Sequence, residues 1–138
     1  MNSRFIHVNV VTELPSAKIF ITDKDYALPS RNWLEGSFYK FFSNWLFSQA
    51  LHKWNEQFDC DNFASLYYNF AQICHYKTQE KLEQGLAVGE MFYRQDSGGG
   101  HAINIAVDNS GVFFIEPQNG KIKKLSHDEK NSCWFVRF

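Results

Sequence analysis

Cys60, His101 and Glu116 are the residues whose types and order along the chain could do chemistry together. A thiolate is the nucleophilic form of cysteine, and a thiol needs a base to take its proton and pass it to a leaving group. Imidazole does this near neutral pH, and a third polar group can fix its ring and tautomer. The three residues therefore predict a nucleophilic triad. Each one alone has an ordinary alternative: a small buried cysteine, a satisfied histidine, and a carboxylate at a strand end.

A helix is expected to begin at residue 59 or 60 and to place Cys60 in its first turn. Asp59 is a suitable N-cap, because its carboxylate can accept the free backbone N–H groups. Apolar residues at helical spacing mark the buried face of this helix: Phe63, Leu66, Tyr67, Phe70, Ile73 and Cys74. The dipole and the free N–H groups at a helix start stabilise an anion, so this position favours a thiolate.

Beyond Gly85 the apolar pattern changes from helical to alternating, which predicts strands over three segments: 86–93, 101–107 and 112–116. Turn-forming residues at 108–111 separate the second segment from the third, so these two are expected to form a hairpin. In that hairpin His101 lies opposite position 117 or 118. Glu116 and Gln118 then fall beside His101, on the same face as each other.

The rest of the chain supplies further elements around this hairpin. Short strands are also predicted at residues 5–11, 18–21, 122–125 and 134–138. Ser30 is a predicted N-cap for an aromatic-rich helical region from Arg31, which Gly36-Ser37 can split. Helices that come mainly first, followed by an antiparallel meander, indicate an α+β fold in a single domain, residues 1–138.

Composition and charge exclude several classes of protein. The formal net charge is −1 and the apolar fraction is 44%, so the chain can fill a core and presents no broad basic surface. The densest basic cluster is Lys121, Lys123 and Lys124, and we expect no nucleic-acid partner. No stretch of about 18 apolar residues is available to span a membrane. The N-terminal sequence also lacks the pattern of a signal peptide.

The three cysteines, Cys60, Cys74 and Cys133, are irregularly spaced. An odd number without an export signal indicates a reducing compartment and no disulfide framework, so we expect a cytoplasmic protein. The cysteines also lack the spacing of a zinc site. Cys74 lies on the apolar helical stripe and Cys133 lies beside Trp134, so we interpret both as structural.

Three short segments carry a resemblance to a known family: Phe58-Asp-Cys60-Asp61-Asn62-Phe63-Ala64, Gly100-His101-Ala102-Ile103-Asn104 and Ile115-Glu116-Pro117-Gln118. They resemble the papain-like cysteine protease domain at the C-terminus of certain fungal agglutinins, and its small bacterial and phage relatives. More distantly, their order is similar to that in transglutaminase-like cysteine peptidases. The resemblance implies a papain/transglutaminase-like fold, with N-terminal helices packed on an antiparallel sheet and the nucleophile at a helix N-terminus.

The resemblance also implies roles for single residues. Cys60 matches the nucleophile, His101 the general base and Glu116 the third member of the triad. It further implies calcium or a similar hard cation, for which Asp61, Glu116 and Gln118 are the available oxygen donors. An Asp in the first helical turn also satisfies the dipole with no metal, so that alternative stays open. The sequence has no lectin domain, and sugar binding is not expected to transfer.

The predicted function is thiol-dependent hydrolysis of an amide bond by a cysteine peptidase-like enzyme, with a peptide or protein as its substrate. The chemistry itself requires no cofactor. Backbone N–H groups at the helix start, with the side-chain amide of Gln118, would stabilise the oxyanion. Two alternatives stay open: deamidation or acyl transfer by the same triad, and a non-enzymatic binding protein, such as a phage-type inhibitor, on the same scaffold. The sequence does not indicate an oligomeric state.

Overall fold

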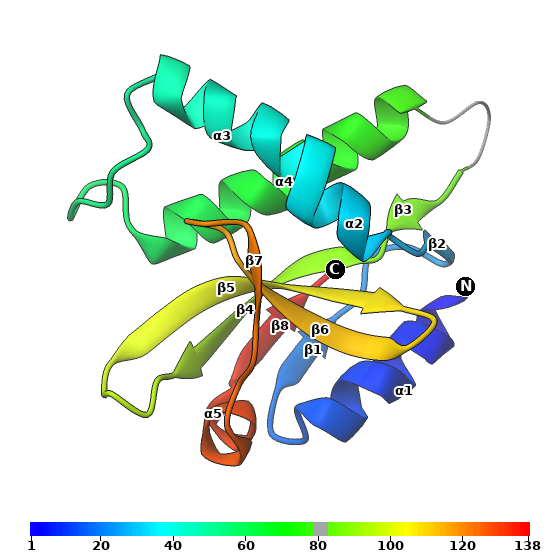
Figure 1. Cartoon of the computed structure of the whole chain (residues 1–138). Helices are drawn as coiled ribbons and strands as arrows, with labels where there is room; N and C mark the ends of the chain where they lie inside the picture. The colour runs from blue at the N-terminus through cyan, green and yellow to red at the C-terminus, as the bar shows by residue number, and fades with distance from the viewer. Residues whose placement is uncertain (79–82) are drawn as a thin grey trace.

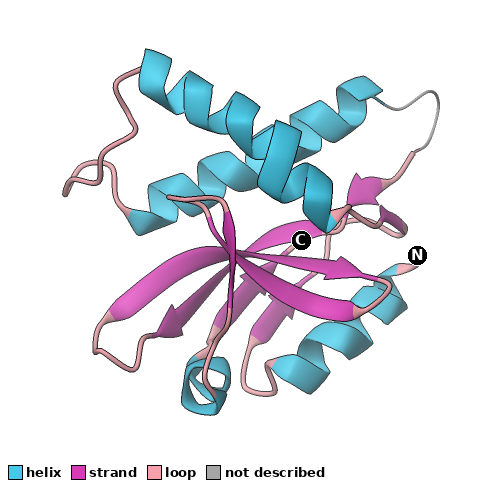
Figure 2. Cartoon of the chain, in the orientation of Figure 1, coloured by secondary structure: helices cyan, strands magenta, loops and turns pink. Residues whose placement is uncertain are grey.

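The structure is a computed structural model that describes residues 1–78 and 83–138. Helices pack on both faces of a central sheet, as Figure 1 and Figure 2 show. The helical segments are α1 (Ser3–Glu13), α2 (Arg31–Trp33), the π-helical η1 (Leu34–Phe38), α3 (Tyr39–Ser48), α4 (Cys60–Thr78) and α5 (His127–Ser132). The strands are β1 (Lys18–Phe20), β2 (Tyr26–Ala27), β3 (Gly85–Leu86), β4 (Val88–Arg94), β5 (Gly100–Asp108), β6 (Gly111–Glu116), β7 (Lys121–Lys123) and β8 (Phe135–Arg137).

The main sheet has six strands in the order β1-β8-β4-β5-β6-β7, and β2 pairs separately with β3. Strands β4 to β7 form an antiparallel meander, β8 is antiparallel to β4, and β1 joins β8 in parallel. The hairpin predicted around residues 108–111 is confirmed, since Asp108 pairs with Gly111 and Asn104 with Ile115. The α+β class with a mainly antiparallel sheet is therefore confirmed in this coarse form.

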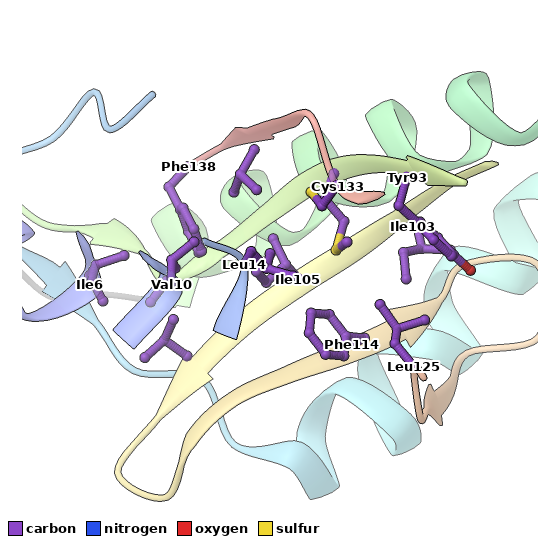
Figure 3. Packing of buried hydrophobic residues seen from close by; sticks show 14 of the residues in the cluster. Ile6, Val10, Leu14, Tyr93, Ile103, Ile105, Phe114, Leu125, Cys133 and Phe138 are labelled. Atoms are coloured by element: carbon purple, nitrogen blue, oxygen red, sulfur yellow. The ribbon is translucent and has the colours of Figure 1, made fainter. Parts of the chain in front are cut away.

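Each face of the sheet has its own apolar core. Helices α3 and α4 cover one face, and α1 and α5 lie on the other (Figure 1). The core on the α1 side includes Ile6, Val10, Leu14, Ile103, Ile105 and Phe114 (Figure 3). The core on the α4 side includes Phe38, Phe42, Phe63, Tyr67, Ala106 and Ile115. Successive residues of β5 serve the two cores in turn, because side chains alternate along a pleated strand.

The first predicted strand, residues 5–11, is wrong, because this segment belongs to helix α1. Asn2 caps the helix, and its side chain accepts a hydrogen bond of 3.0 Å from the Phe5 backbone N–H. Ile6 and Val10 lie four residues apart and are fully buried against the sheet. Burial of this helical stripe outweighs the strand preference of the β-branched residues, so tertiary packing decides the local structure.

The other predicted strands are confirmed with ends that differ by at most two residues, as β1, β3 with β4, β5, β6, β7 and β8. The sequence prediction missed α5, which lies between the last two. This helix starts with a capping box: Ser126 Oγ accepts from the Glu129 N–H at 3.0 Å, and Glu129 Oε1 accepts from the Ser126 N–H at 3.1 Å. The Ser-x-x-Glu spacing was the available signal.

The helical region after Ser30 is confirmed. Ser30 Oγ accepts a hydrogen bond of 3.3 Å from the Trp33 N–H. Gly36 splits the region as predicted, with non-helical backbone angles of φ −102° and ψ −107°, and α3 then runs across α4 (Figure 1). None of the helices in the described part of the chain has the length and apolar character needed to cross a membrane.

Candidate functional site

Cys60 is the first residue of α4, where the sequence placed it. The Asp59 carbonyl accepts the first helical hydrogen bond, from the Phe63 N–H at 3.1 Å. The Asp59 N–H donates to Asn62 Oδ1, also at 3.1 Å. Asp59 therefore occupies the predicted N-cap position, but the side-chain acceptor at this end is the amide of Asn62 rather than the Asp59 carboxylate.

Asn104 fixes α4 against the strand that carries His101. It is fully buried in β5, and its Nδ2 donates to the carbonyls of Ala64 in α4 and Gly89 in β4, both at 2.9 Å. A buried amide is tolerated in a core when it is hydrogen-bonded, and here it ties three elements together. Sequence reasoning missed this role; the signal was a lone polar residue within the apolar run 102–107.

His101 and Glu116 form a direct pair at the same edge of the sheet. Nε2 of the imidazole and Oε2 of the carboxylate are 2.8 Å apart, and the side chains are only 12% and 14% exposed. Because a carboxylate can only accept, the bond assigns a proton to Nε2 and leaves Nδ1 for another partner. Glu116 Oε1 also accepts from the Gln118 backbone N–H at 3.2 Å, and Lys123 Nζ lies 4.0 Å from Oε2.

The Cys60 thiol lies beside the residue that follows His101. Burial is the largest influence on the Cys60 pKa and raises it. Backbone N–H groups of Ala102 and Asp61 hydrogen-bond to the sulfur and lower the pKa, whereas the carboxylates of Asp59 and Asp61 raise it. The net pKa is above that of an ordinary cysteine. Cys60 therefore rests as a neutral thiol, where its place at a helix start alone predicted a thiolate, and ionisation needs a base.

Two of the three predicted calcium ligands, Asp61 and Glu116, are bonded to protein groups. A hydrogen bond with Asp59 is the main cause of a raised Asp61 pKa, and both Glu116 oxygens are bonded as above. Gln118 is exposed in the turn after β6. The prediction that Gln118 shares a strand face with Glu116 is therefore wrong. Within residues 1–78 and 83–138, no group of three or more His, Cys, Asp or Glu side chains could hold a metal ion. A calcium site at Asp61, Glu116 and Gln118 contains only two side chains of these types, and it stays a prediction.

Gly120 determines the backbone conformation of the turn that follows Glu116. Its backbone has φ +72°, and its N–H donates to the Glu116 carbonyl at 2.7 Å. A Cβ atom at this position would overlap the ring of Tyr39 from α3. Glycine alone meets both requirements, so α3 helps to set where Glu116 lies.

Fold and site together define an α+β protein with a partly buried thiol at a helix start, beside the backbone of Ala102, and with a histidine–carboxylate pair on the neighbouring strands. The sequence matches the Agglutinin C-terminal family over residues 34–122, which is more than half of the chain. The chain therefore belongs to that family. No curated protein matches the sequence.

Two solved structures share the fold along the whole chain. PSL1a in complex with E64 has a TM-score of 0.82 and 25% sequence identity. The lectin of Polyporus squamosus, bound to the human-type influenza-binding epitope Neu5Acα2-6Galβ1-4GlcNAc, has a TM-score of 0.80 and 23% identity. The chain is covered completely in both comparisons but spans only 51% and 49% of those two chains.

These comparisons contradict the predicted function. The sequence predicted a cysteine-protease-type amide hydrolase with a peptide or protein partner, and no transfer of sugar binding. The matched family is an agglutinin family, and one relative is a lectin bound to a sialylated oligosaccharide. The predicted protease family, hydrolase activity and peptide partner are corrected accordingly. Neither relative is named as a deamidase, an acyltransferase or a phage-type inhibitor.

Proposed function

We propose that the chain is a binding module of an agglutinin-family protein that captures ligands covalently at Cys60. The observation that carries this proposal is the His101–Glu116 pair, with its 2.8 Å bond and low exposure, next to the backbone N–H of Ala102 that reaches the Cys60 sulfur. The relation to PSL1a, which is in complex with E64, supports a site for small molecules in this fold. Amide hydrolysis is not part of the proposal.

The proposed step forms one bond at the sulfur. The ligand is an electrophile: as the S–C bond forms, His101 Nδ1 takes the thiol proton, and the bond broken at the attacked carbon gives its electron pair to the group it held. With iodoacetamide that group leaves as iodide; with the epoxide E64 it is the ring oxygen, which stays attached and receives a proton. Glu116 holds Nε2–H and stabilises the resulting imidazolium. The N–H groups of Ala102 and Asp61 support the developing sulfur anion. Because burial raises the Cys60 pKa, the step depends on the base rather than on a standing thiolate.

Three further expectations belong to this proposal. The start of α4 beside β5 supports a papain/transglutaminase-like arrangement, with the nucleophile at a helix N-terminus facing an antiparallel sheet. No cofactor enters the step, and calcium binding at Asp61, Glu116 and Gln118 stays a prediction. A cytoplasmic location is supported by three cysteines that are all free, since free thiols persist in a reducing compartment.

Mass spectrometry after exposure to E64, or to iodoacetamide, tests covalent capture. We expect one early adduct, on Cys60, formed faster than on Cys74, whose pKa burial also raises. Cys60→Ala should remove that adduct, and His101→Ala should slow its formation roughly tenfold or more. Equal labelling of the two cysteines, unaffected by His101→Ala, would contradict the proposal.

A second candidate function, carbohydrate binding, is favoured by the glycan-bound lectin among the relatives. A cavity of about 390 Å³ lies at the opposite end of α4 from Cys60, between Trp33, Ser30, His75 and Thr78. An indole with hydroxyl and imidazole groups around it suits a sugar ring, which has apolar C–H faces and a polar rim. With a rise of 1.5 Å per residue, the helix separates the two sites by roughly 25 Å.

Calorimetric titration with Neu5Acα2-6Galβ1-4GlcNAc tests this second candidate. Saturable binding is expected for the wild-type protein and for Cys60→Ala, and it should be lost in Trp33→Ala. Absence of binding, or binding that Trp33→Ala leaves unchanged, would exclude the cavity as a sugar site and leave the thiol proposal standing.

A further inference from the structure

Tyr93 lies against His101 on the neighbouring strand. The two residues are paired directly in the β4–β5 register, and their ring centroids are 5.8 Å apart with an interplanar angle of 68°. Tyr93 has no exposed surface, and in Figure 3 it lies in the core on the α1 side, close to Ile103. A ring enclosed in this way forms a fixed wall beside the imidazole.

The Tyr93 hydroxyl is buried without a hydrogen-bond partner among residues 1–78 and 83–138. Burial raises the Tyr93 pKa, and negative charge on Glu129 and Glu116 raises it further, so the phenol stays neutral. An unpaired buried hydroxyl costs stability that phenylalanine at this position would not. What Tyr93 contributes at this place is therefore the contact of its ring.

The imidazole of His101 needs a second restraint. Its side-chain hydrogen bond in the described part of the chain runs from Nε2 to Glu116. The imidazole can still turn about its Cβ–Cγ bond, and such a turn would change the direction of Nδ1. The edge-to-face contact with Tyr93 opposes this rotation from the side.

We propose that Tyr93 is a positioning residue, whose ring holds the His101 imidazole so that Nδ1 stays directed at Cys60. This inference rests on the proposed covalent capture at Cys60. It makes His101 a residue fixed at two places: by the Glu116 carboxylate at Nε2, and by the Tyr93 ring at its side.

The test compares three variants by the rate of Cys60 alkylation with iodoacetamide, divided by the Cys74 rate in the same sample. Tyr93→Phe keeps the ring and should keep the rate ratio. Tyr93→Leu removes the ring and should lower the ratio roughly tenfold. Phe138→Leu is the matched control, because Phe138 is an equally buried ring in the same core as Tyr93 but packs against Tyr26 rather than His101. It should lower stability and leave the ratio unchanged.

Nitrogen NMR of the wild-type and Tyr93→Phe proteins gives a second readout, which does not depend on Tyr93→Leu folding. A single neutral tautomer of His101 with its proton on Nε2, and cross-peaks between the Tyr93 and His101 rings, are expected. An unchanged ratio in Tyr93→Leu, a lowered ratio in Tyr93→Phe, or a mixture of His101 tautomers would overturn the positioning role. If His101→Ala itself leaves the rate unchanged, the proposed function fails rather than this inference.

Discussion

Replacing Gly120 with alanine is expected to destabilise the protein and displace Glu116. Gly120 has φ +72°, a left-handed conformation that costs other residues about 1–2 kcal/mol. The added methyl group would also overlap the Tyr39 ring, and such overpacking costs about 1–3 kcal/mol. The expected loss is about 2–5 kcal/mol of unfolding free energy, or roughly 10 °C in the melting temperature.

Gly98→Ala is the matched control for this prediction. Gly98 has φ +95°, with no atom within 4 Å of where a Cβ would lie, so its substitution carries the backbone strain alone. Urea denaturation should show Gly120→Ala to be the less stable variant by about 1–3 kcal/mol. Since the Gly120 N–H bonds the Glu116 carbonyl, Gly120→Ala should also slow Cys60 alkylation. Equal losses of stability in the two variants would refute the idea that Tyr39 locks this turn.

Three further perturbations test the electrostatics and the seating of α4. Arg31→Gln removes the 2.6 Å ion pair with Asp108 and should cost ~1 kcal/mol or less, because the arginine is partly exposed. Its hydrogen bond lowers the Asp108 pKa, so this stability is present above the unfolded value of about 3.9 and is lost as the pH falls through the lower folded value. Urea denaturation at neutral and acidic pH measures the difference, and a pH-independent difference would contradict it. Asn104→Ala should lower the free energy of unfolding by about 2–4 kcal/mol, because two buried carbonyls lose their hydrogen-bond donor. A loss well under about 1 kcal/mol, as for an ordinary surface substitution, would show that Asn104 does not fix α4 on the sheet. Asp61→Asn removes a carboxylate whose charge adds to the effect of burial in raising the Cys60 pKa. The pH profile of Cys60 alkylation should therefore move to lower pH. An unchanged profile would exclude an effect of the Asp61 charge on the Cys60 thiol.

The parts of the fold that could be predicted are those set by short stretches of sequence. The turn residues at 108–111 specified the hairpin and its register, and Ser30 specified a helix start. Helix α1 could not be found in this way, because residues 5–11 fit either period and only the sheet beneath Ile6 and Val10 decides between them. The place of β8 next to β4 depends on contacts between distant segments, which chain order does not supply.

In the candidate site too, features set by local sequence could be predicted, and features set by packing could not. The approach of Glu116 to His101 followed from hairpin register and was predictable. The raised Cys60 pKa was not, because its main cause is burial, which depends on how α4 packs on β5. Gln118 was misplaced because the strand ends at Glu116 and a turn begins there. Tyr93 was missed because a cross-strand neighbour is visible only once β4 and β5 are paired.

The pH dependence of Cys60 alkylation, compared between the wild-type protein and His101→Ala with Cys74 as internal reference, tests the central claim most directly. The account predicts that the two proteins react alike at high pH, where the thiol ionises unaided. Near neutral pH, where the thiol is protonated, His101→Ala should be roughly tenfold slower or more. Identical profiles for the two proteins would contradict a site in which His101 serves as the base for Cys60.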